Sequence, residues 1–226
     1  MEPTLPKGRK PSPDGRVARG EVTQARVLDA AERCFAATGF DAVSIRQIAA
    51  EAGVTLGVVG FHGGSKEALI RTVLARRVDT LNRLRREALA GLRARGGITL
   101  VDLVDGYVTP YLEIASRGDP QWRAYAQLIA RIVSDDRYYR DVSALYDPVA
   151  QEYLDAMAEC RPEADRQALA TGLALSVASM LSIVASTLRI TTLSGRPAPE
   201  SPIAFRGMLV AFCAGGIERA LAAGQG

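Results

Sequence analysis

The sequence contains little histidine and cysteine: one histidine and three cysteines among 226 residues. Cys34, Cys160 and Cys213 are far apart, odd in number and without metal-ligand spacing. This pattern favours a reducing compartment over a disulfide framework. No catalytic triad, no metal-binding cluster and no glycine-rich phosphate loop after a strand pattern is present. We therefore expect no metal, no cofactor and no enzymatic activity.

The N-terminus lacks an apolar run, so no secretory signal is expected and the protein is predicted to be cytoplasmic. One charge-free segment is long, with 22 residues from Gln167 to Leu188. Its length alone is compatible with a membrane span, but hydroxyl and amide side chains make it only moderately apolar. We interpret it as a helix buried on nearly all sides and expect no membrane partner.

Charge is divided unevenly along the chain. Residues 1–96 contain 17 Lys and Arg against 10 Asp and Glu, whereas residues 97–226 contain 11 against 15. The excess of basic residues in residues 1–96 suits contact with nucleic-acid phosphates, but solvent-exposed helix faces explain the same charge distribution. Residues 1–20 are rich in proline and basic residues and poor in apolar ones, which predicts a disordered basic arm. Such an arm is either a minor-groove contact or an inert tail.

The segment from Ser44 to Gly53 predicts a short amphipathic helix. Ser44 is a good N-cap, and Gln47 stands three residues later, where it completes a capping box. Gly53 is placed to end the helix in a left-handed conformation. A longer helix is expected before it, over about 23–38, from the helical spacing of its apolar residues.

A second short helix is expected directly after this turn. Thr55 can cap it, and Gly63-Gly64 must end it before Ser65 caps a long amphipathic helix over about 66–95. Two short helices joined by a tight turn are typical of a helix-turn-helix, whose second helix lies in the DNA major groove.

These patterns resemble a known family. From Val27 to Leu74 the sequence is similar to the N-terminal domain of the TetR family of bacterial transcriptional repressors, with AAERCFAATGF, SIRQIAAEAGV and GSKEAL in order. The resemblance implies an all-α homodimer with a DNA-binding head and a C-terminal domain that binds a small inducer. The residues expected at the DNA surface are Ser44, Arg46, Thr55, Leu56, Gly57, Val58, Phe61, His62 and Lys66.

The sequence departs from the family in the recognition helix itself. Leu56, Val58, Gly60 and Gly63 stand where the family commonly has lysine, threonine, tyrosine and phenylalanine. We therefore expect a soft recognition helix that contacts DNA mainly through phosphates, the arm and thymine methyls. Phe61 is expected to refill the core space that an aromatic at position 63 would occupy.

The remainder predicts further amphipathic helices with aromatic residues gathered between Tyr107 and Tyr153. Pro110 is expected to kink or interrupt its helix, and Asp147-Pro148 to begin a new one. Core packing explains most of the aromatics, but helical bundles also place ligand cavities between helices. The residues expected at an apolar or aromatic inducer are Tyr107, Trp122, Tyr125, Ile129, Met180 and Ile183. Arg123 and Arg131 are considered for an anionic group, although a surface position fits them better.

Small residues recur at four-residue spacing in the last two long helices and permit close helix approach. The ridges are formed by Ala174, Ala178 and Ser182, and by Gly207, Ala211 and Gly215. We expect a homodimer through these helices.

Together the patterns predict an all-α protein with a three-helix DNA-binding head, followed by a larger helical ligand-binding and dimerisation bundle. The expected divisions are a basic arm (1–20), the helix-turn-helix domain (21–68) and the bundle (69–226). The predicted function is a ligand-responsive repressor that binds double-stranded operator DNA and is released by a small inducer. The alternative is a ligand-binding helical dimer whose DNA head is degenerate or depends on another partner.

Overall fold

The computed structural model describes residues 13–117, 119–133 and 136–223, and within these ranges the chain forms helices and no strand. The all-α fold class is thus confirmed. The elements are α1 (Pro13–Thr38), α2 (Ile45–Ala52), α3 (Leu56–Gly63), α4 (Lys66–Arg95), α5 (Leu100–Ala115), α6 (Pro120–Ile132), α7 (Asp136–Cys160), α8 (Arg166–Ala185), α9 (Leu188–Ser194), the 3₁₀ turn η1 (Pro202–Phe205) and α10 (Arg206–Ala223).

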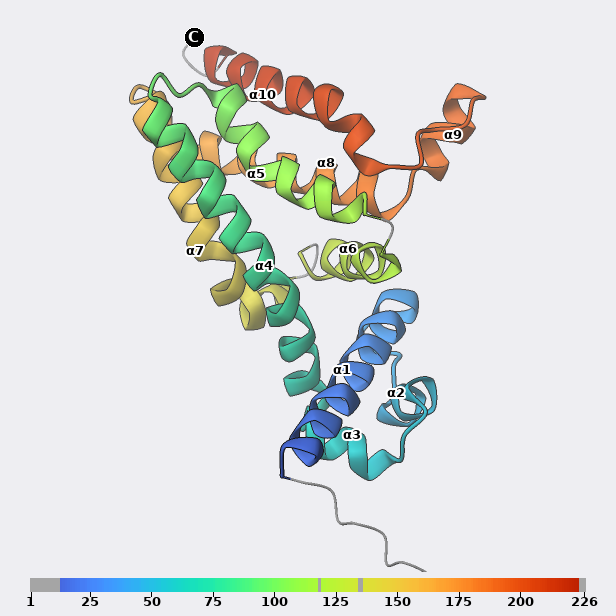
Figure 1. The fold of residues 1–226 in the computed structure, drawn as a ribbon. Coiled ribbons are helices and arrows are strands. Elements are labelled where there is room, and N and C mark those ends of the chain that lie inside the picture. Colours follow the sequence, from blue (N-terminus) through green and yellow to red (C-terminus); the bar gives the residue numbers. More distant parts are fainter. Residues whose placement is uncertain (1–12, 118, 134–135, 224–226) are drawn as a thin grey trace, which may run out of the picture.

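The helices are arranged as a small head and a larger body (Figure 1). Helices α1, α2 and α3 form the head, and α10 lies at the opposite end of the molecule. The long helix α4 begins in the head and runs into the body, so it belongs to both parts. Helix α6 lies between α1 and the other helices of the body, where it packs against both α1 and α8.

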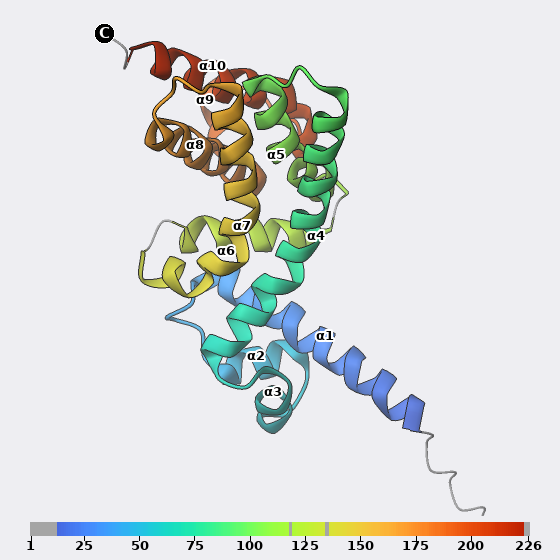
Figure 2. The ribbon, with the colours of Figure 1, turned by 90° about the vertical axis from the view of Figure 1, so that its left-hand side faces the viewer.

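The first helix is longer than the sequence pattern predicts. It was expected over about 23–38, whereas α1 begins at Pro13. Residues 13–20 of the expected disordered arm are therefore helical, and residues 1–12 lie outside the described part of the chain. Proline suits the first turn of a helix because its φ is already helical and its missing N–H has no partner there. Figure 2 shows the N-terminal end of α1 extending away from the body.

Local capping fixes α2 as predicted. The Ser44 side chain accepts a hydrogen bond from the Gln47 N–H, and the Ser44 N–H donates to Gln47 Oε1 at 2.7 Å. Gly53 ends the helix at φ 62°, a conformation that favours glycine. Arg26 of α1 then donates to the Ala52 carbonyl oxygen at 2.7 Å, which ties the end of α2 to α1.

The space next to Gly63 is filled differently from the sequence expectation. Gly63 is buried, and a Cβ at this position would lie 2.8 Å from Cδ1 of Leu69. Leu69 is fully buried, so this leucine of α4 occupies the space that an aromatic side chain would need. Phe61 does not refill it, because its side chain is 85% exposed. The prediction that Phe61 fills this space is therefore wrong, because Leu69 of α4 packs against α3 there.

Two helices of the body continue through their prolines. Helix α5 includes Pro110 and helix α7 includes Pro148. An interruption at Pro110 and a new helix at Asp147-Pro148 are therefore wrong predictions. Pro110 is buried in a helix that packs against α4, α8 and α10. Such packing outweighs the loss of one backbone hydrogen bond, because tertiary contacts supply most of the stability of a helix in a protein.

The charge-free segment forms most of α8, which ends at Ala185, and the separate short helix α9 begins at the last residue of the segment, Leu188. By length and composition alone, Arg166–Ala185 qualifies as a possible membrane span. It packs against α5, α6, α7 and α10, but only one side of it is covered, and 39% of its apolar window is buried. The expectation that it is buried on nearly all sides is therefore wrong for a single copy of the chain.

We predict that Gly63→Phe destabilises the protein by about 1 to 3 kcal/mol, because Leu69 already fills the adjoining space. The matched control is Gly60→Ala on the same helix, where a Cβ meets nothing within 4 Å. This substitution should stabilise the helix by up to about 1 kcal/mol. Urea unfolding of the three proteins measures both effects, and a Gly63→Phe variant as stable as the parent would contradict the packing described above.

Candidate DNA-binding surface and ligand cavity

Helix α3 presents an exposed and mostly apolar surface. Leu56 is 48% exposed and Phe61 85% exposed, while Val59 is fully buried against the head core. Val58 is half-buried, and Gly57 and Gly60 are exposed. The outward side of α3 therefore offers van der Waals surface rather than side-chain hydrogen-bond groups, as its sequence indicates.

Polar groups are found at the ends of α3. Thr55 occupies the N-cap position and is exposed, and its side chain makes no cap hydrogen bond, which leaves its hydroxyl available to another partner. At the other end His62 is half-buried and lies edge-on to the Phe61 ring, with 4.9 Å between ring centroids. The unpaired N–H groups of the first helical turn face the same side as the N-cap and are a general site for anions.

The three remaining expected DNA contacts lie beside α3 on neighbouring elements. Arg46 is exposed and makes no hydrogen bond or ion pair with a described residue. Ser44 is exposed, with its hydroxyl engaged in the capping box. The Lys66 ammonium donates to the Asp41 carbonyl oxygen at 3.1 Å and lies 4.6 Å from the centre of the Phe40 ring. Lys66 thus joins α4 to the loop before α2, with its charge partly satisfied within the head.

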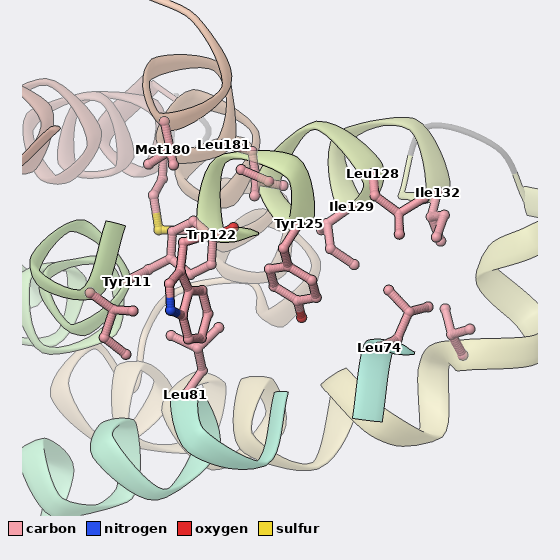
Figure 3. Packing of buried hydrophobic residues seen from close by; sticks show 14 of the residues in the cluster. Leu74, Leu81, Tyr111, Trp122, Tyr125, Leu128, Ile129, Ile132, Met180 and Leu181 are labelled. Atoms are coloured by element: carbon pink, nitrogen blue, oxygen red, sulfur yellow. The ribbon is translucent and has the colours of Figure 1, made fainter. Parts of the chain in front are cut away.

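A cavity of about 480 Å³ lies between α4, α5, α6, α7 and α8, and it opens to the surface beside the exposed Ala174 and Ala178 of α8. This volume is within the usual range for small-molecule sites, about 300 to 1,000 Å³. Figure 3 shows Tyr125 extending from α6 toward α4, and Leu81 extending from α4 toward α6. The wall residues are Leu81, Arg85, Tyr107, Tyr111, Tyr125, Ile129, Val133, Tyr139, Tyr146, Asp147, Ala150, Gln151, Leu154, Ala170, Leu173, Ala174, Val177, Ala178, Met180 and Leu181.

The wall agrees only partly with the residues expected from sequence. Tyr107, Tyr125, Ile129 and Met180 line the cavity. Trp122 does not line it but packs edge-on against Tyr125, with 5.7 Å between ring centroids. The other expected residues are elsewhere: Ile183 is half-buried outside the wall, and Arg123 and Arg131 are exposed.

Arg85 is the wall residue that sequence reasoning missed most clearly. It is absent from the residues expected at an inducer, yet it is only 5% exposed. Its position in the sequence indicates this burial, because Arg85 stands four residues after Leu81 and four before Leu89. Both leucines are buried on the same face of α4. Arg85 Nε donates to the Tyr107 carbonyl oxygen at 3.0 Å, and its guanidinium lies 3.8 Å from the centre of the Tyr107 ring.

Tyrosine is the most frequent residue with a polar group in the wall. The Tyr125 and Tyr146 hydroxyls lie 2.8 Å apart and share a hydrogen bond. The Tyr111 hydroxyl is buried and has no hydrogen-bond partner in the described part of the molecule. Burial raises the pKa of the Tyr111 and Tyr146 phenols well above the usual value, so both stay neutral and can donate. The Tyr139 hydroxyl donates to the Asp147 carboxylate.

A polar cluster joins the head to the body. The Glu32 carboxylate of α1 is fully buried and accepts hydrogen bonds from Arg77 at 2.9 and 3.1 Å and from Arg76 at 3.1 Å, both on α4. Gln121 of α6 donates to the same carboxylate at 3.0 Å. Burial raises the pKa of the Glu32 carboxyl, and the two arginines oppose that rise. We define Glu32, Arg76, Arg77 and Gln121 as the junction cluster.

Another exposed apolar surface lies on the two packed helices α8 and α10. Leu175 is 63%, Met208 75% and Phe212 70% exposed. The small residues expected at a dimer interface are exposed on the same helices, namely Ala174, Ala178, Ser182, Gly207, Ala211 and Gly215. This face has the composition expected of a helix-helix interface. In the residues that the structure describes, no group of His, Cys, Asp and Glu is arranged to hold a metal ion.

Two family models match the chain. The model described as bacterial regulatory proteins, tetR family, matches residues 27–73, and a tetracyclin repressor-like C-terminal domain matches residues 105–216. Two curated relatives from Pseudomonas putida match over 64 residues: the HTH-type transcriptional regulator SrpR at 42% identity, and TtgW, an uncharacterized HTH-type transcriptional regulator, at 40%. These matches cover 28% of this chain, and only 30% and 48% of the two relatives.

Solved structures share the fold across most of the chain. A tetR family transcription regulator from Shewanella sp. PV-4 has a TM-score of 0.60 at 16% identity, covering 86% of this chain and 97% of its own. The fatty acid degradation regulator FadR from Bacillus halodurans has a TM-score of 0.57 at 14% identity, covering 92% and 98%. FadR from Bacillus subtilis, solved in complex with stearoyl-CoA, has a TM-score of 0.55 at 14% identity. The match covers 85% of this chain and 98% of that FadR chain. At these identities the likeness concerns the fold alone.

We predict that Glu32→Ala lowers the free energy of unfolding by about 3 kcal/mol, because it leaves Arg76 and Arg77 without their buried partner. The matched control is Glu51→Ala, which removes a surface pair with Arg33 whose side chains are 45% and 44% exposed. That loss should be below about 1 kcal/mol. Urea unfolding compares the two, and equal effects would show that the junction cluster contributes no more than a surface pair.

Proposed function

Because the chain belongs to the TetR family of bacterial transcriptional regulators, we propose that it is a ligand-responsive repressor. Two copies bind double-stranded operator DNA through α3, and a small apolar or aromatic inducer in the body cavity releases them. A protein that acts on the chromosome of a bacterium works in the cytoplasm, which is where we place it.

One observation carries this proposal: the helices that line the cavity also hold the head. Helix α6 provides Tyr125 to the cavity wall and Gln121 to the junction cluster, one helical turn apart. Helix α4 provides Arg85 to the wall and Arg77 to the junction, and it continues into the head. A molecule that moves either wall therefore acts directly on contacts that orient α1.

DNA contact is proposed to come from the exposed side of α3 and its flanks. The Thr55 hydroxyl and the first N–H groups of α3 suit a phosphate, and the Arg46 guanidinium suits a second one. Leu56, Val58 and Phe61 offer apolar contact with thymine methyl groups in the major groove. Gly57 leaves the backbone free to approach, and we place Ser44, His62 and Lys66 at the edge of the same surface.

The small number of hydrogen-bonding side chains on α3 also favours a second candidate function. In that alternative the protein is a ligand-binding dimer whose head is degenerate or depends on another partner. A gel-shift titration of the full chain against the DNA flanking its own gene decides between the two. Tighter binding of one fragment than of random DNA at physiological salt supports the repressor, whereas equal binding of all fragments supports the alternative.

A homodimer is proposed through α8 and α10. The exposed Leu175, Met208 and Phe212 are large apolar side chains on helices whose other sides are already packed in the body. The exposed small residues between them permit close approach of a second helix pair. Two heads on one dimer would also meet DNA half-sites roughly 34 to 36 Å apart, as helix-turn-helix dimers do.

We predict that Arg46→Ala weakens binding to specific and random DNA by similar factors, because a phosphate contact carries no sequence information. The slope of log affinity against log salt should become shallower by about one. Arg123→Ala, at an exposed arginine of α6, is the matched control and should change neither quantity. Gel shifts at several salt concentrations measure both quantities. An unchanged slope for Arg46→Ala would show that Arg46 is not part of the DNA-binding surface.

We predict that Phe212→Arg converts the dimer to a monomer at micromolar concentration, because it places an unpaired charge inside an apolar interface. Val101→Arg is the matched control, since Val101 is 51% exposed on α5, outside the proposed interface. Light scattering reports the mass of each variant. A parent protein that is monomeric, or a Phe212→Arg variant that stays dimeric, would refute the proposed interface.

A further inference from the structure

We infer that the cavity binds an organic anion: a carboxylate carried on an apolar body, held by Arg85 and by tyrosine hydroxyl groups. This inference rests on the proposed function, because it names the chemical class of the ligand in that regulator. It is argued from the groups in the wall that lack a partner.

Arg85 is a buried cation without a counter-charge. It is 5% exposed, and no carboxylate among the described residues lies within ion-pair distance of it. Its Nε donates to the Tyr107 carbonyl oxygen, and its terminal N–H groups donate to no acceptor among the described residues. Arg85 is also a wall residue of the cavity. By contrast, Arg77 of the same helix is paired with the buried Glu32. A buried arginine without such a partner is costly unless something supplies the negative charge.

The tyrosines next to Arg85 have more hydrogens to donate than acceptors. The buried Tyr111 hydroxyl has no partner among the residues that the structure describes. Tyr125 and Tyr146 share one hydrogen bond, so whichever hydroxyl accepts it still has its own hydrogen to donate. All three tyrosines are wall residues of the cavity. This part of the wall is a set of donors that a carboxylate can satisfy with two oxygens.

The wall also contains one carboxylate, Asp147, which limits where an anion can lie. Asp147 accepts a hydrogen bond from the Tyr139 hydroxyl, so its acceptor capacity is already used in part. An anionic ligand group avoids Asp147 and lies at the Arg85, Tyr111 and Tyr125 side. A cationic ligand would make the opposite choice, and this gives the inference a clear alternative to be tested against.

The rest of the wall suits an apolar body. Beyond these polar groups the cavity is lined mainly by aliphatic side chains, namely Leu81, Ile129, Val133, Leu154, Leu173, Val177, Met180 and Leu181. Both an aryl and an alkyl group fit such surroundings, so the shared chemistry is a monocarboxylate with an apolar remainder. The cavity volume of about 480 Å³ suits a small molecule.

The test titrates the full-length protein with two acids, biphenyl-4-carboxylate and dodecanoate, by calorimetry. Each acid is paired with its primary amide, and dodecylamine tests for a cationic ligand. We expect the acid to bind at least about tenfold more tightly than its amide, because a charge-assisted hydrogen bond is lost. The series in which this happens distinguishes an aromatic from an aliphatic ligand. Acids that bind no better than the amides or the amine, or no binding in either series, would overturn the inference.

Two variants test the residues themselves. Arg85→Gln should abolish the preference for the acid, and Arg86→Gln, at the neighbouring exposed arginine paired with Glu152, should leave it unchanged. Tyr111→Phe removes a hydroxyl without a hydrogen-bond partner among the described residues. We therefore expect this variant to fold even if Arg85→Gln does not. It should weaken acid binding by about threefold or more and amide binding less. An unchanged preference in Tyr111→Phe and Arg85→Gln would refute the assignment.

Failure of this inference is distinguishable from failure of the proposed function. The gel shift tests DNA binding without any ligand, whereas the calorimetry tests the cavity without any DNA. Specific DNA binding without acid preference leaves the regulator in place and removes the anionic ligand. Acid preference without specific DNA binding keeps the ligand class and favours the degenerate head.

Discussion

The buried carboxylate of Glu32 is the interaction on which the connection between head and body depends. It lies on α1, yet it accepts hydrogen bonds from side chains of α4 and α6. A carboxylate without access to water needs these partners, and the Arg77 guanidinium in turn needs the carboxylate, whereas Arg76 also pairs with Asp29 at 2.6 Å. The head therefore has one well-defined orientation on the body, and any change in the spacing of α4 and α6 disturbs it.

The length of α6 makes this connection short. Helix α6 spans Pro120–Ile132, and Gln121 near its start belongs to the junction cluster. Tyr125, four residues later, points into the cavity, and Ile129 lies a further turn along. One turn of helix is about 5.4 Å, so a ligand at Tyr125 is separated from the head by little more than that distance along α6. A rigid helix of this kind transmits a shift of its wall residues to Gln121 with little loss.

Much of this arrangement is predictable from sequence, and the exceptions share a physical cause. The caps at Ser44 and Gly53 depend on residues a few positions apart, so local pattern was sufficient for α2. The filling of the space at Gly63 by Leu69, and the burial of Arg85, depend on side chains from other helices. The helical spacing of apolar residues also does not distinguish a solvent-exposed arginine from one that lines a cavity. The two differ only in whether the residues one helical turn before and after the arginine are buried.

Helix α8 shows the limit of such patterns most clearly. Its segment has no charge, yet within a single chain only one of its sides meets apolar surroundings. Met180 and Leu181 are buried in the body, whereas Leu175 is 63% exposed. Burial within a chain, burial by a second copy and burial in lipid all select the same apolar residues. The small residues Ala174 and Ala178 on the exposed side favour a second helix over lipid, since they gain little from lipid contact but permit two backbones to approach closely.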